Sequence, residues 1–127
     1  MLKAYAGSLV AFLALDAVWL GVIARGAYNR WIGHLMRESP LWPAAAAFYL
    51  LYIAGIVLLA VQPGLESGSW KTAAFRGAVL GLIAYGTYDF TNYATLRDWP
   101  WTMVAVDLVW GTFLTGVAAA AGYFFAR

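Results

Sequence analysis

Four long apolar runs restrict the fold of this chain more than any other feature of its sequence. They occupy residues 2–24, 41–62, 72–95 and 99–126. A helix needs about 20 apolar residues to cross the hydrocarbon core of a bilayer, so each run is long enough to span it with some tilt. The sequence therefore predicts an all-α integral membrane protein, in which residues 1–127 form a single domain of four transmembrane helices in an antiparallel bundle.

The absence of cysteine and the dispersed positions of the basic residues exclude several kinds of function. The chain has no cysteine, which removes disulfides, iron–sulfur clusters and thiolate metal sites. Its eight lysine and arginine residues lie near the ends of the runs without clustering, which argues against nucleic acid as a partner. Four of them fall on each side of the membrane, so the positive-inside rule does not decide the orientation.

The beginning of the chain looks like a signal peptide, because Lys3 precedes an apolar run. The run continues past Asp16 and Trp19, beyond the length of an ordinary signal sequence, and offers no small-x-small cleavage site. We therefore expect residues 2–24 to be retained as the first membrane span.

Residues 26–37 are too polar to span a membrane but follow an amphipathic pattern. One face is apolar and the other polar, with Tyr28, Trp31, Ile32 and Leu35 opposite Asn29, Arg30, Gly33, His34 and Arg37. The pattern predicts a short interfacial helix between the first two spans, which either anchors in the headgroups or covers a ligand as a lid. His34 has no second histidine or cysteine nearby, so we interpret it as a solvated residue rather than a zinc ligand.

The most polar stretch within an apolar run extends from Tyr85 to Thr95. Four of its side chains recur at i, i+3, i+4 and i+7, namely Tyr85, Tyr88, Asp89 and Asn92. They share one helix face, which must be directed towards the protein interior. Earlier in the same run, Gly77-x-x-x-Gly81 predicts the close approach of another helix. The connection at residues 96–98 is so short that the third and fourth runs must be antiparallel neighbours.

Three runs each carry one aspartate, at Asp16, Asp89 and Asp107. Counted from the surface shared by the first and third loops, they lie at depths of about 12, 9 and 12 Å. An ionised aspartate facing lipid costs about 2.5 to 3.5 kcal/mol, so we expect the three to face one another or a common cavity. No basic residue lies at this depth, so the carboxyl groups either hold protons or attract a cation.

Aromatic residues accompany the acids. Asp16-x-x-Trp19 in the first run is echoed by Asp107-x-x-Trp110 in the fourth, either as an internal repeat or by chance. We predict a ligand-binding chamber between spans one, three and four, lined by Asp16, Trp19, Tyr85, Tyr88, Asp89, Asn92, Asp107 and Trp110. Acidic groups and aromatic walls suit a small amphipathic, cationic or lipid-like molecule, which the protein binds and, in the stronger form of the hypothesis, translocates.

Two other interpretations stay open. A membrane-embedded lipid-modifying enzyme could use the aspartates, either as a carboxyl dyad of Asp89 and Asp107 or with a divalent ion on Asp16, Asp89, Asp107 and Asn92. Alternatively, Tyr88, Asp89 and Asn92 form a hydrogen-bonded polar core in a structural or partner subunit. The sequence identifies no catalytic residue and no cofactor, and it leaves homo-oligomerisation open.

The motifs named above, taken together, resemble those of one protein family. They are Leu15-Asp16-x-x-Trp19-Leu20-Gly21, Phe48-Tyr49, the stretch from Tyr85 to Leu96, and Asp107-x-x-Trp110-Gly111-Thr112. The family consists of small bacterial four-span membrane proteins catalogued as domain of unknown function 2177. The resemblance covers essentially the whole chain and implies a multi-pass protein of the bacterial cytoplasmic membrane. It implies no activity.

The size and layout are also similar to those of the small multidrug transporters, which have four spans and an acid in the first. That resemblance implies a proton-coupled role for Asp16. Those proteins do not add acids in the third and fourth spans, where this chain has Asp89 and Asp107. The similarity is therefore one of architecture only.

Overall fold

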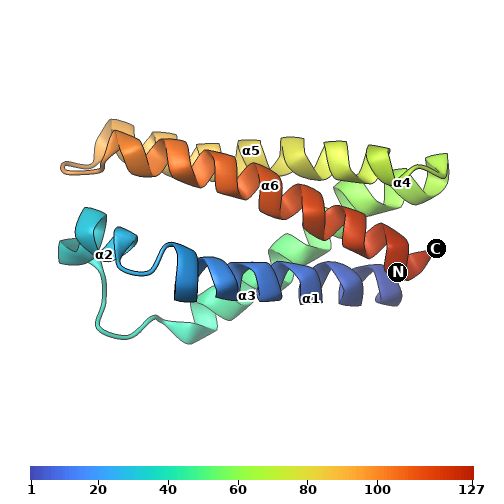
Figure 1. Cartoon of the computed structure of the whole chain (residues 1–127), viewed down its shortest axis with the longest axis horizontal. Helices are drawn as coiled ribbons and strands as arrows, with labels where there is room; N and C mark the ends of the chain where they lie inside the picture. The colour runs from blue at the N-terminus through green and yellow to red at the C-terminus, as the bar shows by residue number, and fades with distance from the viewer.

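The computed structural model describes all residues from Met1 to Arg127, and the chain is helical throughout with short connections (Figure 1). In chain order the elements are α1 (Leu2–Val18), η1 (Trp19–Ile23), α2 (Ala27–Ile32), η2 (Gly33–Leu35), α3 (Trp42–Ile56), η3 (Val57–Val61), α4 (Gln62–Ser67), α5 (Trp70–Thr95) and α6 (Trp101–Ala126). η1 and η3 are widened π-helical turns, so α1 with η1, and α3 with η3 and α4, each form one continuous helix.

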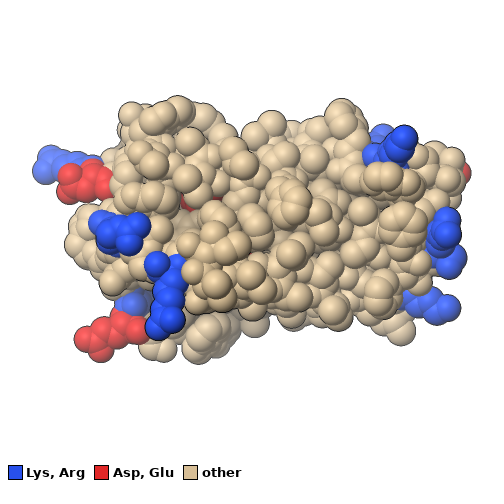
Figure 2. Space-filling view, viewed as in Figure 1, with Lys and Arg blue, Asp and Glu red and all other residues tan.

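Three of these helices are long and apolar enough to cross a membrane, namely Leu2–Ile23, Trp42–Ser67 and Trp101–Ala126. α5 has the same length as α6, but its polar half lowers its hydropathy and it does not join the three. Figure 2 shows the charged residues gathered at the two ends of the molecule, with a broad uncharged surface between them. The predicted all-α membrane architecture is thus confirmed, with three candidate membrane-spanning helices.

The second apolar run continues as helix further than the sequence predicts. The predicted run ends at Gln62, and Pro63 and Gly64 are typical turn residues, but the helix extends to Ser67. The π-helical turn η3 directly precedes this segment, so the hydrogen bonding is already irregular where the N–H of Pro63 is missing. Gly68 then ends the helix in the left-handed conformation, at φ 70°.

Three other boundaries also differ from the prediction. α5 begins at Trp70, because the hydroxyl of Ser69 caps it by accepting a hydrogen bond from the backbone N–H of Thr72 at 3.4 Å. α6 begins at Trp101, after extended backbone at Pro100. The predicted helix at 26–37 is instead the short pair α2 and η2, because the backbone leaves the helical region at Ile32, where φ is −134°.

Small residues bring α5 and α6 into backbone contact, as Gly77-x-x-x-Gly81 predicts. A Cβ atom placed on Gly77 would meet the backbone oxygen of Thr115 at 2.7 Å, and one on Gly81 would collide with the carbonyl group of Gly111. The two helices are antiparallel and joined by residues 96–100 (Figure 1). This part of the predicted arrangement is confirmed.

α1 packs along α6 on the other side, again through small residues. Gly7 and Gly122 leave no room for a Cβ atom, and the hydroxyl of Ser8 donates to the backbone oxygen of Ala118 at 2.9 Å. The main apolar core follows from these contacts and includes Phe12, Ile53, Ile56, Val61 and Leu114, all fully buried. It fills the half of the molecule nearer the two chain ends and leaves the α2 end for the site.

Candidate functional site

A cavity of about 380 Å³ lies at the α2 end of the molecule, and residues from every long helix line it. Its lining is mainly aromatic, with two aspartates and four aliphatic or methionine side chains, and consists of Asp16, Trp19, Leu20, Tyr28, Ile32, Met36, Tyr49, Tyr85, Tyr88, Trp99, Met103, Asp107 and Trp110. No lysine or arginine is among these residues. We call this cavity the chamber.

The structure brings together most of the side chains that the sequence predicts for the chamber. Asp16, Trp19, Tyr85, Tyr88, Asp107 and Trp110 all line it. Asp89 is fully buried beside Asp107 but is not part of the lining. Asn92 is half-buried near the end of α5 and does not line the chamber either.

Asp16 projects from α1 and is held by side chains from two other helices. The hydroxyl of Tyr49, on α3, donates to its Oδ2 at 2.9 Å. The indole N–H of Trp110, on α6, points to its Oδ1 at 3.5 Å. Each oxygen of this half-buried carboxylate therefore has one hydrogen-bond partner, and the residue also lines the chamber.

Asp107 projects from α6 and is bound by the short helix α2. The hydroxyl of Tyr28 donates to its Oδ1 at 2.5 Å, and the indole N–H of Trp19 donates to that hydroxyl at 3.0 Å. Burial, together with the neighbouring carboxylate, raises the pKa of Tyr28 above its ordinary value. The Tyr28 hydroxyl therefore keeps its proton at neutral pH and acts as the donor.

The two Asp-x-x-Trp motifs face each other across the chamber. The Trp19 and Trp110 rings are stacked, with centroids 4.4 Å apart and planes 10° from parallel. Each indole N–H is directed to the other motif, because Trp110 reaches Asp16 directly and Trp19 reaches Asp107 through Tyr28. α1 and α6 are antiparallel (Figure 1), so the two motifs run in opposite directions along neighbouring helices.

Asp89 is the least satisfied polar group in the structure. It is fully buried, and neither of its carboxyl oxygens has a hydrogen-bond partner. It lies beside Asp107 and the ring of Trp99, whose indole nitrogen is also without a partner. A buried carboxyl group without partners destabilises the fold, and a second carboxyl next to it adds repulsion.

The hydroxyl groups on the remaining face of α5 are not part of the chamber. Thr87, Thr91 and Thr95 each donate to the backbone oxygen four residues earlier in the helix. Such bonds satisfy the hydroxyls within the helix itself, so these residues are compatible with an apolar surrounding.

Sequence reasoning missed Tyr28, Tyr49 and Trp99 as chamber residues. The sequence marks Tyr28 only as part of the apolar face of residues 26–37 and Tyr49 only as part of the motif Phe48-Tyr49, and it does not single out Trp99. Their hydroxyl and N–H groups matter because distant segments bring them next to the acids, and no local spacing signals that.

We expect Tyr28→Phe to loosen α2 from the chamber without unfolding the protein. The change removes a hydrogen bond to a charged group, which contributes about 1.5 to 3 kcal/mol. Amide hydrogen exchange in residues 26–36 should then accelerate by roughly 10- to 100-fold in mass spectrometry. Tyr93→Phe is the matched control, because Tyr93 is an exposed tyrosine of α5 that packs on Trp101. Equal protection in the two variants would contradict the assigned role of Tyr28.

The acids do not gather into a metal site. No group of three or more histidine, cysteine or acidic side chains lies close enough to hold a metal ion. Only Asp89 and Asp107 are adjacent, and Asp16 is bound on the opposite wall by Tyr49 and Trp110. The geometry thus gives the divalent-ion form of the enzyme hypothesis no support.

The helices and their apolar surface place this chain in the class of α-helical membrane proteins. A family model described as "Predicted membrane protein (DUF2177)" matches residues 1–124. The chain therefore belongs to the DUF2177 family, as its motifs suggested. No curated protein and no solved structure shows a significant match to it.

Proposed function

We propose that this protein binds a small organic cation with an apolar body in the chamber. One observation carries the proposal: two carboxylates, Asp16 and Asp107, face a cavity with aromatic walls and no basic side chain. A ligand that brings a positive charge and an apolar surface would complement both features at once.

The proposal includes α5 as a fourth membrane span. α5 has 26 residues, runs antiparallel to α6 and touches it through Gly77 and Gly81 in one half and Tyr85 in the other. Only residues 96–100 join the two helices, so α5 must cross the bilayer in the direction opposite to α6. Its polar groups are compatible with that position, since the threonines bond to their own helix and Asp89 is buried against α6.

The charge balance of the chamber favours a cationic ligand. Carboxylates inside a membrane protein are costly unless a partner offsets them, by about 2.5 to 3.5 kcal/mol each near a helix centre. The phenols and indoles around Asp16 and Asp107 donate hydrogen bonds but carry no positive charge. A bound cation would supply that charge, and the indole rings of Trp19 and Trp110 that line the chamber would contact its apolar part.

The volume of the chamber limits the size of the ligand, and the position of the chamber limits the path by which a ligand could enter or leave. A volume of about 380 Å³ is within the range of about 300 to 1,000 Å³ for small-molecule sites. Tyr28, Ile32 and Met36 line it from α2 and the residues that follow, which supports the lid form of the interfacial-helix hypothesis. Towards the chain ends the buried core begins at Phe12 and Tyr52, so translocation would require that core to open.

The test is a tryptophan-fluorescence titration of the purified protein with benzyltrimethylammonium. Trp19 and Trp110 line the chamber and should report binding directly. We expect Asp16→Asn and Asp107→Asn each to weaken binding by at least about 10-fold, the effect of one favourable charge contact worth about 1.4 kcal/mol. Asp98→Asn, in the exposed loop before α6, is the matched control and should leave the affinity unchanged.

Two outcomes would overturn the proposal. One is unchanged affinity in the Asp16→Asn and Asp107→Asn variants while both remain folded. The other is equal binding of neopentylbenzene, the uncharged analogue of the probe. If these two variants lost thermal stability and the wild-type protein bound no cation, the acids would be structural.

A further inference from the structure

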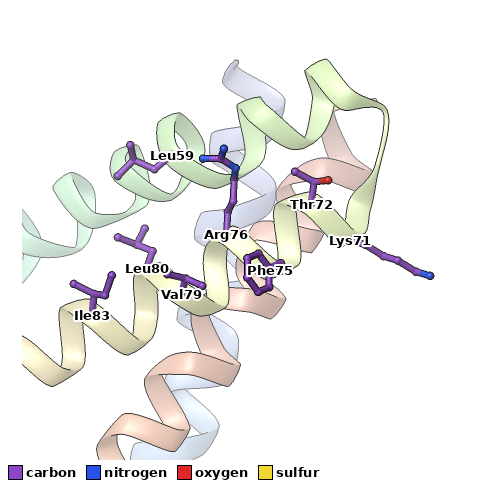
Figure 3. Close-up of a pocket in the computed structure, with 8 residues that line it drawn as sticks. All are labelled: Leu59, Lys71, Thr72, Phe75, Arg76, Val79, Leu80 and Ile83. Carbon is purple, nitrogen blue, oxygen red and sulfur yellow. The ribbon is translucent and has the colours of Figure 1, made fainter.

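A second feature lies at the opposite end of the molecule from the chamber, near the two chain ends. A groove of about 620 Å³ separates η3 from the first half of α5 (Figure 3). Its lining is apolar except at one end, and consists of Leu59, Lys71, Thr72, Phe75, Arg76, Val79, Leu80 and Ile83. No acidic residue is among them.

The surface around this groove has the character of one that faces acyl chains. Phe75 is 70% exposed, Ile83 60% and Leu59 51%. Large apolar side chains exposed to this extent would be unfavourable in water but are favourable against acyl chains. The groove therefore opens towards lipid along most of its length.

Arg76 is the exception on this surface. It lies six residues beyond the start of α5, or about 9 Å along the helix. Figure 3 shows its side chain extending across the groove towards η3, while Lys71 extends from the end of the helix. An exposed arginine at this depth lies near the boundary between headgroups and acyl chains, where an anionic group would stabilise it.

We propose that this groove binds an anionic phospholipid of the surrounding bilayer. The phosphate would lie on the guanidinium of Arg76, which matches two phosphate oxygens at once, with Lys71 adding a second positive charge. The hydroxyl of Thr72 lies between these two cations on the first turns of α5 and can donate to the same headgroup (Figure 3).

The rest of the groove accommodates an acyl chain. Val79, Leu80 and Ile83 continue from Arg76 towards the middle of the molecule and present only apolar atoms. A headgroup at Arg76 would thus place its tail in the groove in the direction that a bilayer lipid requires. Two cations without an acidic neighbour favour an anionic headgroup over a zwitterionic one, in which an ammonium group would be repelled.

The experiment is native mass spectrometry of the full-length protein from nanodiscs that contain equal amounts of phosphatidylglycerol and phosphatidylcholine. We expect the wild-type protein to retain phosphatidylglycerol preferentially, and Arg76→Gln to reduce that retention by at least about 10-fold. Arg127→Gln is the matched control, because Arg127 lies at the same end of the molecule, on the aromatic ring of Phe124, and outside the groove. Arg76→Lys keeps the charge but not the two-point contact, and should retain an intermediate amount.

A further variant tests the apolar part. Val79→Trp would fill the groove without changing its charge, and it should reduce retention of the lipid while leaving Arg76 and Lys71 in place. The proposal is overturned if Arg76→Gln retains as much phosphatidylglycerol as the wild-type protein, or if Arg127→Gln loses as much as Arg76→Gln. It is also overturned if soluble glycerol phosphate displaces the lipid completely, because the acyl chain would then contribute nothing.

Discussion

Gly81→Val should unfold or strongly destabilise this protein, and it is the largest effect that we expect from a single substitution. The added side chain would collide with the carbonyl group of Gly111 and would bring its Cβ to 2.8 Å from that of Thr115. A backbone carbonyl cannot rotate away as a side chain can, so α5 and α6 would have to separate. Overpacking of this kind costs about 1 to 3 kcal/mol or more, and this contact should lie at or above the upper end.

The measurement is the apparent melting temperature in detergent, followed by tryptophan fluorescence and by loss of monodisperse protein. Gly55→Ala is the matched control, because no atom lies within 4 Å of a Cβ placed there. In a helix interior that change should be neutral or should stabilise by up to about 1 kcal/mol. Equal melting temperatures for Gly81→Val and the wild-type protein would show that the α5–α6 contact is looser than described.

Asp89→Asn should have the opposite effect to Gly81→Val and raise the stability of the protein. Asp89 is fully buried, has no hydrogen-bond partner and lies beside Asp107. The amide cannot ionise, so it removes the cost of a buried charge next to Asp107, and its N–H group can donate a hydrogen bond to Asp107. Hydrogen bonds to charged groups contribute about 1.5 to 3 kcal/mol, so the melting temperature should rise by several degrees.

The same variant should bind the cationic probe more weakly, since an amide next to the chamber cannot ionise to balance the charge of the probe. A gain in stability with a loss of binding is the pattern expected of a residue retained for function at a cost to the fold. Asp98→Asn, which changes an exposed carboxylate, should alter neither quantity. A fall in melting temperature for Asp89→Asn would identify Asp89 as part of a structural polar core, as the structural interpretation of the sequence holds.

Local sequence patterns predict most of the fold correctly. The apolar runs identify the long helices, and Gly77-x-x-x-Gly81 identifies the face of α5 that meets α6. The errors lie at helix ends, where hydrogen bonding differs from a regular α-helix. The π-helical turn η3 allows the helix to continue past Pro63, and the backbone at Ile32 ends α2 early.

The candidate site is only partly predictable, for a related reason. The sequence identifies Asp16, Asp107, Trp19 and Trp110, because an acidic residue followed by tryptophan three positions later is unusual in an apolar run. Their pairing was not foreseeable: each indole N–H is directed to the aspartate of the opposite helix, directly or through Tyr28.

The sequence by itself determined that this chain is a helical membrane protein, because apolar length and the cost of exposing backbone polar groups to lipid leave few alternatives. It also predicts that the three carboxyl groups lie at a common depth. Only the tertiary structure decided that Asp16 and Asp107 line one chamber, that Asp89 lies behind it, and that Tyr28 and Tyr49 complete it. The reason is that helix period sets the face on which a side chain lies, whereas packing between helices sets which faces meet.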